Sequence, residues 1–176
     1  MEINKIDKEH YLKIRKNVSD LIKQAANEND TTGSIVLDVA PEIHKGAAEH
    51  FKNATIKTLD LDPNSKADYI ADLCKNNSGY LLDETFDVII CTEVLEHTEN
   101  PFNAINELYR ILKIGGTLYL STPFNFRIHG PLPDNWRFTI HGLNTLLKNF
   151  KEVKIDELQD ENRNLMPIQY TVVAKK

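Results

Sequence analysis

The sequence predicts an α/β fold, in which a mostly parallel, doubly wound sheet is covered by helices on both faces. Three observations lead to this class. Short apolar runs typical of buried strands alternate with segments whose apolar residues recur at helical spacing. Acidic residues stand at the ends of several of those runs. The chain has 176 residues, of which 41% are hydrophobic and 27% charged, a composition typical of one globular domain.

The composition also limits the classes of function. Lys and Arg total 21 against 26 Asp and Glu, and the net charge of -5 argues against a nucleic-acid partner. The two cysteines form no Cys-x-x-Cys motif and favour a reducing compartment. The chain has no run of 18 apolar residues, and its start lacks the apolar region of a signal peptide. We therefore expect a cytoplasmic protein without a membrane partner.

The first part of the chain is expected to hold one long helix and three strands. Apolar residues from Tyr11 to Ala25 recur at three- and four-residue spacing, which predicts an amphipathic helix within residues 1–30. The polar run NENDTTGS ends it. The elements expected next are a strand at 35–39, a helical segment at 46–51, and strands at 54–61 and 69–73.

The second part opens with FDVIICT at 86–92, the most apolar stretch, which predicts a central strand. Asn100 and Pro101 are typical of a helix start, and Gly115 is expected to close that helix. Residues 124–138 show no period, and loops of this length inside compact domains are usually functional or disordered. The other expected elements are strands at 117–122, 151–158 and 168–174 and a helix at 139–150.

Together these elements predict a Rossmann-like, seven-stranded sheet in one domain that spans residues 1–176. No helix is expected between the last two strands, so the last strand should run antiparallel to its neighbours. Open sheets of this kind bind ligands at the carboxyl ends of their strands, beside the switch in strand order. The loops after Val39, Leu59, Ile70, Cys91 and Thr122 should therefore surround one cleft.

Three acids are expected at that cleft. Asp38 and Asp60 end the first two strands, at close to the spacing where a carboxylate accepts hydrogen bonds from a ribose. Asp72 follows the third strand and could accept from an exocyclic amine. Such a set suits a nucleoside and not a pyrophosphate, which carboxylates repel. The alternative is that each acid caps a helix or faces water.

Several stretches resemble the class I S-adenosylmethionine-dependent methyltransferases. VLDVAP, KTLDLDP and ADYIADL are similar to the family's first three motifs. FDVIICTEVLEHTENPFNAINELYRILKIGGTLYLSTPF resembles its fourth strand, the helix that follows and the turn into the fifth strand. PLPDNWRFTIHGLNTLLKNF is similar to a signature found after that strand in one branch. The resemblance covers about residues 35–154.

This resemblance implies a cofactor, S-adenosylmethionine, with S-adenosylhomocysteine as its product. Together with the helix expected from the apolar spacing, it divides the single domain into an N-terminal helix at 1–30, a cofactor-binding half at 34–123, and an acceptor loop with the C-terminal strands at 124–176. The residues expected at the cofactor are Asp38 near the methionine part, Asp60 at the ribose, Asp72 and Leu73 at the adenine, and Thr92 and Glu93 near the methionine and the methyl group, with Ala40, Pro41 and Leu61 as further cofactor-binding residues.

The chain departs from the family in its first motif. Where the family has Asp-x-Gly-x-Gly-x-Gly, this chain reads DVAPEIHKG, with Ala40 and Glu42 at the first two glycine positions and Gly46 farther on. Glycine allows positive φ and a close approach of the backbone to a ligand. Either this loop is a working variant, or the chain is a catalytically inactive methyltransferase-like domain that binds a partner or regulates it.

The expected catalytic residues are His97, Glu93 and His129. As a histidine, His97 could serve as a base, or it could simply hydrogen-bond to backbone. Glu96 is expected to face solvent. His44 and His50 lack nearby cysteines, so no metal is expected. The expected acceptor-binding residues are His129, Asp134, Trp136 and Arg137.

The acceptor loop has its own alternative, in which its aromatic residues pack under it and Arg137 ties it to a carboxylate. The expected reaction is methyl transfer to an oxygen or nitrogen of a small molecule or saccharide. A protein acceptor stays open, and a nucleic acid is disfavoured. The acceptor contacts would come from the N-terminal helix, the 124–138 loop and, in a homodimer, a second subunit. A nicotinamide-dependent oxidoreductase ranks last, because the first strand is not followed by Gly-x-Gly-x-x-Gly.

Overall fold

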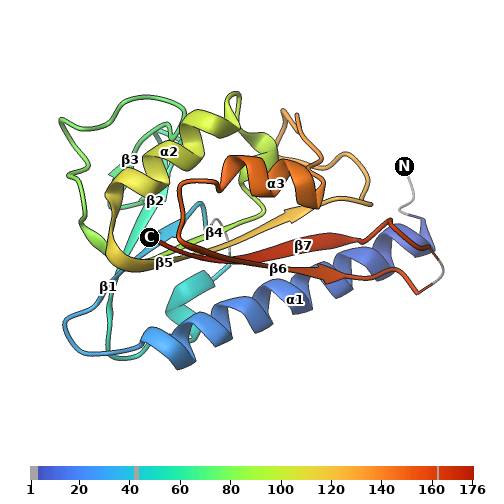
Figure 1. The fold of residues 1–176 in the computed structure, drawn as a ribbon, viewed down its shortest axis with the longest axis horizontal. Helices are drawn as coiled ribbons and strands as arrows, with labels where there is room; N and C mark the ends of the chain where they lie inside the picture. The colour runs from blue at the N-terminus through green and yellow to red at the C-terminus, as the bar shows by residue number, and fades with distance from the viewer. Residues whose placement is uncertain (1–3, 42–43, 162) are drawn as a thin grey trace.

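A computed structural model describes residues 4–41, 44–161 and 163–176 and contains a seven-stranded sheet (Figure 1). The strands are β1 Ile35–Val39, β2 Thr55–Asp60, β3 Tyr69–Ile70, β4 Phe86–Thr92, β5 Leu112–Pro123, β6 Glu152–Leu158 and β7 Gln169–Lys175. The helices are α1 Lys5–Asn29, α2 Pro101–Ile111 and α3 Ile140–Leu146, with short 3₁₀ helices η1 Gly46–Glu49 and η2 Leu95–His97.

The strand order is β3-β2-β1-β4-β5-β7-β6. The pairs among β1 to β5 are parallel, whereas β7 runs antiparallel to both β5 and β6. The predicted fold class and the antiparallel last strand are therefore confirmed. Because β1 lies between β2 and β4, the strand order switches there, and the carboxyl ends of β1 and β4 border the position where such sheets bind ligands.

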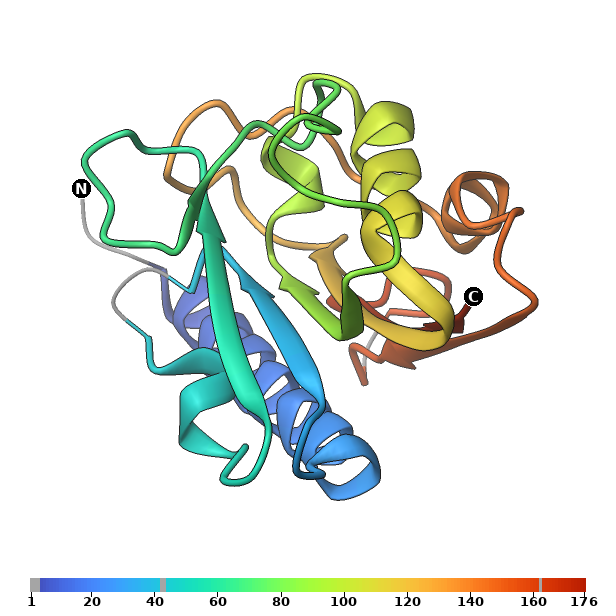
Figure 2. The same ribbon diagram turned by 90° about the vertical axis from the view of Figure 1, so that its left-hand side faces the viewer.

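Helices cover both faces of the sheet. α1 lies along one face, and α2 and α3 lie on the other (Figures 1 and 2). Successive side chains of a strand point to opposite faces, so Val36 joins the apolar cluster under α1 while Leu37 joins the cluster under α2 and α3. Val88 and Ile89 of β4 divide in the same way. This double burial explains the continuous apolar runs of the central strands.

The prediction that Gly115 closes the helix after Asn100 was wrong. Asn100 does cap α2, since its side chain accepts from Asn103 N, but α2 ends at Ile111 and β5 begins at once. Leu112 pairs with Phe86 of β4, so a strand ladder replaces the expected last helical turn. Several other expected elements are shorter in the structure, namely the strand at 69–73, the helical segment at 46–51 and the helix at 139–150.

The loop at 124–138 contains no helix or strand and is held at both ends. Its start continues the β5–β7 pairing, because Phe124 N donates to Ile168 O. Toward its end, Asn135 N and Trp136 N both donate to the carbonyl of Glu96 in η2. The loop is therefore fixed over the turn that follows β4. Among the described residues, no helix is long and apolar enough to cross a membrane.

Candidate active site

A cavity of about 1040 Å³ opens at the carboxyl ends of β1, β2 and β4. α1 adds Tyr11 and Arg15 to its lining, and the 124–138 loop adds Phe126 and His129. The predicted site residues that line it are Asp38, Ala40, Pro41, Asp60, Leu61, Asp72, Leu73, Thr92, Glu93, His97 and His129. The structure thus brings together side chains that the sequence spreads from the first strand to the loop, whereas Asp134, Trp136 and Arg137 lie outside this lining.

Asp38 is buried at the end of β1, with 3% of its surface exposed. Its Oδ2 accepts a hydrogen bond from Ala47 N at 2.6 Å. Burial raises the pKa of Asp38 to about 6, although the Ala47 N–H works in the opposite direction. Gly46 packs directly on this carboxylate, since a Cβ on Gly46 would lie 2.2 Å from Asp38 Oδ2. This close approach explains why a glycine stands at position 46.

Ala40 adopts a left-handed backbone conformation with a φ of 48°, although it is not a glycine. Its N–H donates to Leu59 O at 2.7 Å, which ties the loop after β1 to β2. The loop therefore keeps a glycine-like course at the first altered position of the motif. Glu42, the second altered position, lies outside the described residues.

Asp60 and Asp72 are held by tight local turns. Asp60 Oδ1 accepts from Asp62 N at 2.9 Å, and Asp72 Oδ1 accepts from Cys74 N at 2.8 Å. Side chains that bond to the backbone two residues on form Asx turns, which fix the carboxylate at the strand end. Leu73 is buried beside Asp72, whereas Leu61 is largely exposed at the rim.

Glu93 follows β4 with a φ of 54°, a conformation that non-glycine residues rarely adopt. Its Oε1 accepts from Ser121 Oγ and from Gln169 Nε2, both at 2.7 Å. Asn17 of α1 in turn donates to Gln169 Oε1 at 2.7 Å. Burial raises the pKa of Glu93, against the two hydrogen bonds that favour its charged form. Strained backbone of this kind clusters at functional sites.

The prediction that Glu96 faces solvent was wrong, because its side chain is fully buried. η2 turns it beneath the 124–138 loop, where its Oε1 lies 3.7 Å from His97 Nε2 and 3.6 Å from His129 Nε2. Burial, and then the neighbouring Glu93, raise the pKa of Glu96 well above its usual range. No local pattern around Glu96 indicates this burial, because the loop that covers it comes from far along the chain.

The two histidines come from separate segments and meet edge to face, with ring centroids 4.9 Å apart. His97 Nδ1 lies 2.9 Å from Pro133 O. His129 Nδ1 lies 3.0 Å from Asp134 Oδ2, at hydrogen-bond distance but without the angle of a regular hydrogen bond. Burial lowers the pKa of His129, only partly offset by Asp134.

Asp134 and Arg137 pair with each other inside the loop. The carboxylate accepts from both guanidinium nitrogens and from His129 N. Burial works to raise the pKa of Asp134, but these hydrogen bonds prevail and lower it to about 2. Trp136 stacks on Phe138 and donates from Nε1 to Thr98 O at 2.8 Å. This geometry matches the alternative in which Arg137 ties the loop to a carboxylate.

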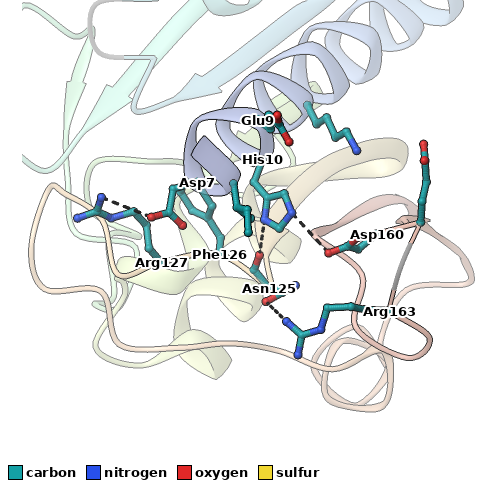
Figure 3. Close-up of a pocket in the computed structure, with 11 residues that line it drawn as sticks. Asp7, Glu9, His10, Asn125, Phe126, Arg127, Asp160 and Arg163 are labelled. Atoms are coloured by element: carbon teal, nitrogen blue, oxygen red, sulfur yellow. Dashed lines mark hydrogen bonds and ion pairs between the residues drawn. The ribbon is translucent and has the colours of Figure 1, made fainter. Parts of the chain in front are cut away.

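A second cavity of about 630 Å³ lies between the start of α1 and the loop that follows β6 (Figure 3). His10 Nδ1 lies 3.2 Å from Asn125 O, and His10 Nε2 lies 3.5 Å from Asp160 Oδ2. Arg127 Nη1 lies 3.8 Å from Asp7 Oδ2. None of the predicted site residues lines this cavity. Its charged groups pair across it and fix the first residues of the 124–138 loop against α1.

Comparison with known proteins gives this geometry a context. A ubiquinone biosynthesis O-methyltransferase of Xanthomonas campestris pv. campestris is 33% identical over 86 residues, which are 49% of this chain and 32% of the relative. The match thus spans about a third of that relative's length.

Two solved structures share the fold. A SAM dependent methyltransferase from Archaeoglobus fulgidus superposes with a TM-score of 0.61 at 15% identity, covering 94% of this chain and 99% of that one. The second structure is phosphoethanolamine N-methyltransferase 2 of Haemonchus contortus in complex with S-adenosyl-L-methionine. It superposes with a TM-score of 0.65 at 14% identity, and the match covers 88% of this chain and 52% of that chain.

A family model described as a methyltransferase domain matches residues 9–170, nearly the whole chain. The cleft at the strand switch and the sheet order agree with that match. The chain therefore belongs to the methyltransferase-domain family of class I S-adenosylmethionine-dependent methyltransferases, whose cofactor is S-adenosylmethionine.

Proposed function

We propose that this chain binds S-adenosylmethionine in the 1040 Å³ cavity and transfers its methyl group to a hydroxyl oxygen of a small molecule or saccharide. The observation that carries the proposal is that one cavity holds the strand-end acids at one side and Glu93, His97 and His129 at the other. The curated relative is named an O-methyltransferase, which supports oxygen over nitrogen as the acceptor atom.

The residues present fit this cofactor. Small-molecule sites usually enclose roughly 300–1,000 Å³, so a cavity of about 1040 Å³ has room for a cofactor and an acceptor. Asp38, Asp60 and Asp72 supply carboxylates that can accept hydrogen bonds from the ammonium, hydroxyl and exocyclic amine groups of the ligand, and their negative charge attracts its sulfonium. The same acids would repel a pyrophosphate.

S-adenosylmethionine supplies, when bound, a methyl group already activated on a sulfonium. The work of the chain is then to position the acceptor and exclude water, and positioning alone can contribute much of the rate. Asp60 would hold the ribose, Asp38 the methionine end, and Asp72 with Leu73 the adenine. Glu93, His97 and His129 would contact the acceptor hydroxyl, and the 124–138 loop would shield it.

Of the loop residues, His129 would contact the acceptor, while Asp134 and Arg137 would position His129. Trp136 is held against Thr98 and Phe138, so we propose no acceptor contact for it. Both cysteines are free, which agrees with our proposal of a cytoplasmic enzyme.

Calorimetric titration with S-adenosylhomocysteine and S-adenosylmethionine tests the proposal. We expect saturable binding of both ligands. At about 100 times the dissociation constant, ligand should add roughly 2.7 kcal/mol of stability and raise the melting temperature by about 5–11 °C. Absence of binding at millimolar ligand would contradict the proposal and identify the chain as an inactive, partner-binding domain. If the ligands bind, hydroxyl and amine acceptors should then be compared, and methylation of amines alone would contradict the oxygen assignment.

A further inference from the structure

We infer that Glu96, His97 and His129 bind a divalent transition-metal ion of the Zn²⁺ class at the acceptor side of the cavity. The three ligand atoms lie within 4.8 Å of one another, although His129 comes from a loop far along the chain from the other two residues. The expectation of no metal considered His44 and His50, whereas the fold brings a different pair of histidines together.

The distances suit a tetrahedral ion. Glu96 Oε1 lies 3.7 Å from His97 Nε2 and 3.6 Å from His129 Nε2. Zn²⁺ binds nitrogen and oxygen ligands at roughly 2.0–2.2 Å, and a tetrahedron with bonds of about 2.2 Å has edges of about 3.6 Å. Both separations exceed the reach of a direct hydrogen bond, so Glu96 Oε1 bonds to neither ring, which leaves a point among the three ligand atoms where an ion can lie.

Both histidines direct the correct nitrogen to this point. A metal-binding histidine usually gives its other ring nitrogen to a backbone carbonyl or a carboxylate, which fixes the ring and its tautomer. His97 Nδ1 is placed to donate to Pro133 O at 2.9 Å, and His129 Nδ1 lies 3.0 Å from Asp134 Oδ2. The Nε2 of His97 is thereby left as a lone-pair donor, and Asp134 stands beside His129 Nδ1 without the angle of a regular hydrogen bond, where it favours the ring proton on Nδ1 and the lone pair on Nε2. Arg137 holds Asp134 in turn, which orders the outer shell.

Glu96 gives the second, independent observation. Its side chain is fully buried, and its Oε1 has no hydrogen-bond partner among the described residues. Its other oxygen, Oε2, accepts from Thr122 Oγ1 at 3.4 Å, which is long for a hydrogen bond between oxygens. A buried carboxylate oxygen without a hydrogen bond is unfavourable unless a proton or a bound cation compensates its charge. The oxygen lies between two imidazole nitrogens, where a bound cation would meet it.

The donor set also indicates the chemistry. Two histidines and one carboxylate leave at least one open position, as in catalytic zinc sites and in related iron sites. Because His97 and His129 line the cavity, that position opens to the acceptor. Resting on the proposed function, we assign the ion to the acceptor hydroxyl, whose pKa a bound metal lowers.

In this reaction the acceptor oxygen forms a bond to the methyl carbon. The carbon–sulfur bond breaks with its electron pair remaining on sulfur, and the hydroxyl proton leaves to water. His97 Nε2 is then a metal ligand and not the base.

The test starts from the full chain, stripped of metal with a chelator and titrated with ZnCl₂. We expect one Zn²⁺ per chain. Glu96→Gln, His97→Ala and His129→Ala should each weaken its binding by more than the roughly 10–100-fold that loss of an outer-shell partner causes. His141→Ala, which removes an exposed histidine of α3, is the matched control and should leave binding unchanged. Visible absorption of the Co²⁺-substituted chain should show the d–d bands of the bound ion, and these bands should be lost in all three variants and kept in His141→Ala.

Binding of S-adenosylhomocysteine by each variant shows that it has folded, and it separates the two ideas. If the cofactor product binds but Zn²⁺ does not, or if all three variants keep Zn²⁺, the metal site is overturned while the proposed function stands. If Zn²⁺ binds and the cofactor product does not, the proposed function fails and the metal site stands. Loss of Zn²⁺ in the three variants, with cofactor-product binding kept, supports the inference.

Discussion

The two sides of the cavity are built by different means. The side that we propose for the cofactor, called the cofactor side, has Asp38, Asp60 and Asp72 at or just beyond the carboxyl ends of neighbouring parallel strands, whose ladders fix it. The side that we propose for the acceptor, called the acceptor side, is held by contacts between polar side chains of Glu96 and His97 from η2 and of residues 129, 134 and 137 from the loop. One side therefore follows from backbone pairing, and the other from a buried polar network.

This difference predicts how each side responds to mutation. A side chain at a strand end can be removed while the ladder beneath it stays, so the effect should be confined to ligand binding. In a buried network each polar group supplies the hydrogen bond or the opposite charge that its neighbour needs. Removing one group therefore leaves the hydrogen-bonding capacity or the charge of its partner uncompensated. We therefore expect substitutions on the acceptor side to lower the stability of the fold, and substitutions on the cofactor side mainly to lower the affinity for the ligand.

The largest effect should come from Arg137→Ala. The side chain of Asp134 is fully buried and paired with Arg137, so the substitution leaves a carboxylate without its cation. Breaking a buried pair by removing one partner costs about 3–5 kcal/mol. The melting temperature should fall by about 6–20 °C, measured by calorimetry.

Arg127→Ala is the matched control, because Arg127 forms a partly exposed ion pair with Asp7 at 3.8 Å. Such pairs contribute about 0–1 kcal/mol, so this variant should melt close to the wild type. Equal losses in the two arginine variants would show that the Asp134 pair is not special and would remove the proposed contrast between the two sides.

The pH dependence of Asp38 should give the next largest effect. Its folded-state pKa of about 6 lies above the ordinary value of 3.8, so the folded chain binds this proton more tightly than the unfolded chain does. The contribution of Asp38 to stability is therefore full below pH 3.8 and is lost as the pH rises through about 6. At about 1.4 kcal/mol per pKa unit, the loss amounts to up to about 3 kcal/mol.

Asp38→Asn isolates this effect from other titrating groups, because the amide resembles the protonated acid and can still accept from Ala47 N–H. The stability difference between wild type and variant should grow between pH 4 and pH 7, with the wild type the less stable at pH 7. Denaturant titrations at each pH measure it. Parallel curves for the two proteins would mean that Asp38 titrates normally.

The same contrast explains what the sequence could predict. The strand ends were predictable, since apolar runs mark the strands and the acids follow directly, so Asp38, Asp60 and Asp72 were placed correctly at one cleft. Glu96 was not predictable, because its burial depends on a loop that folds back over η2 from far along the chain. The end of α2 was also missed, since pairing of Leu112 with β4 overrode a local glycine signal.

On the cofactor side, Asp60→Ala should weaken the binding of S-adenosylhomocysteine by more than about tenfold, or 1.4 kcal/mol, because a ribose would lose its acceptor. The melting temperature without ligand should change little, since the β2 ladder does not involve this side chain. Asp156→Ala on exposed β6 is the control and should bind as the wild type does. Unchanged affinity in a folded Asp60→Ala chain would take Asp60 out of the site.

The smallest effect on the free energy of unfolding should come from Ala40→Gly. The sign of this effect shows whether the backbone at Ala40 is strained. A left-handed conformation costs a non-glycine residue about 1–2 kcal/mol, whereas a new glycine adds unfolded-chain entropy worth about 0.5–1 kcal/mol. With Ala40 at a φ of 48°, the net result should be a gain of up to about 1.5 kcal/mol, with cofactor-product affinity kept.

Ala67→Gly offers the comparison, because Ala67 lies in a loop and is not among the residues with positive φ. It should lose about 0.5–1 kcal/mol through the entropy term alone. If both glycine variants lose stability equally, Ala40 is not strained. If Ala40→Gly gains stability while binding of the cofactor product stays unchanged, Ala40 keeps the glycine-like backbone conformation of the first motif. The methyl side chain of Ala40 then lowers the stability of the fold and leaves the affinity for the cofactor product unchanged.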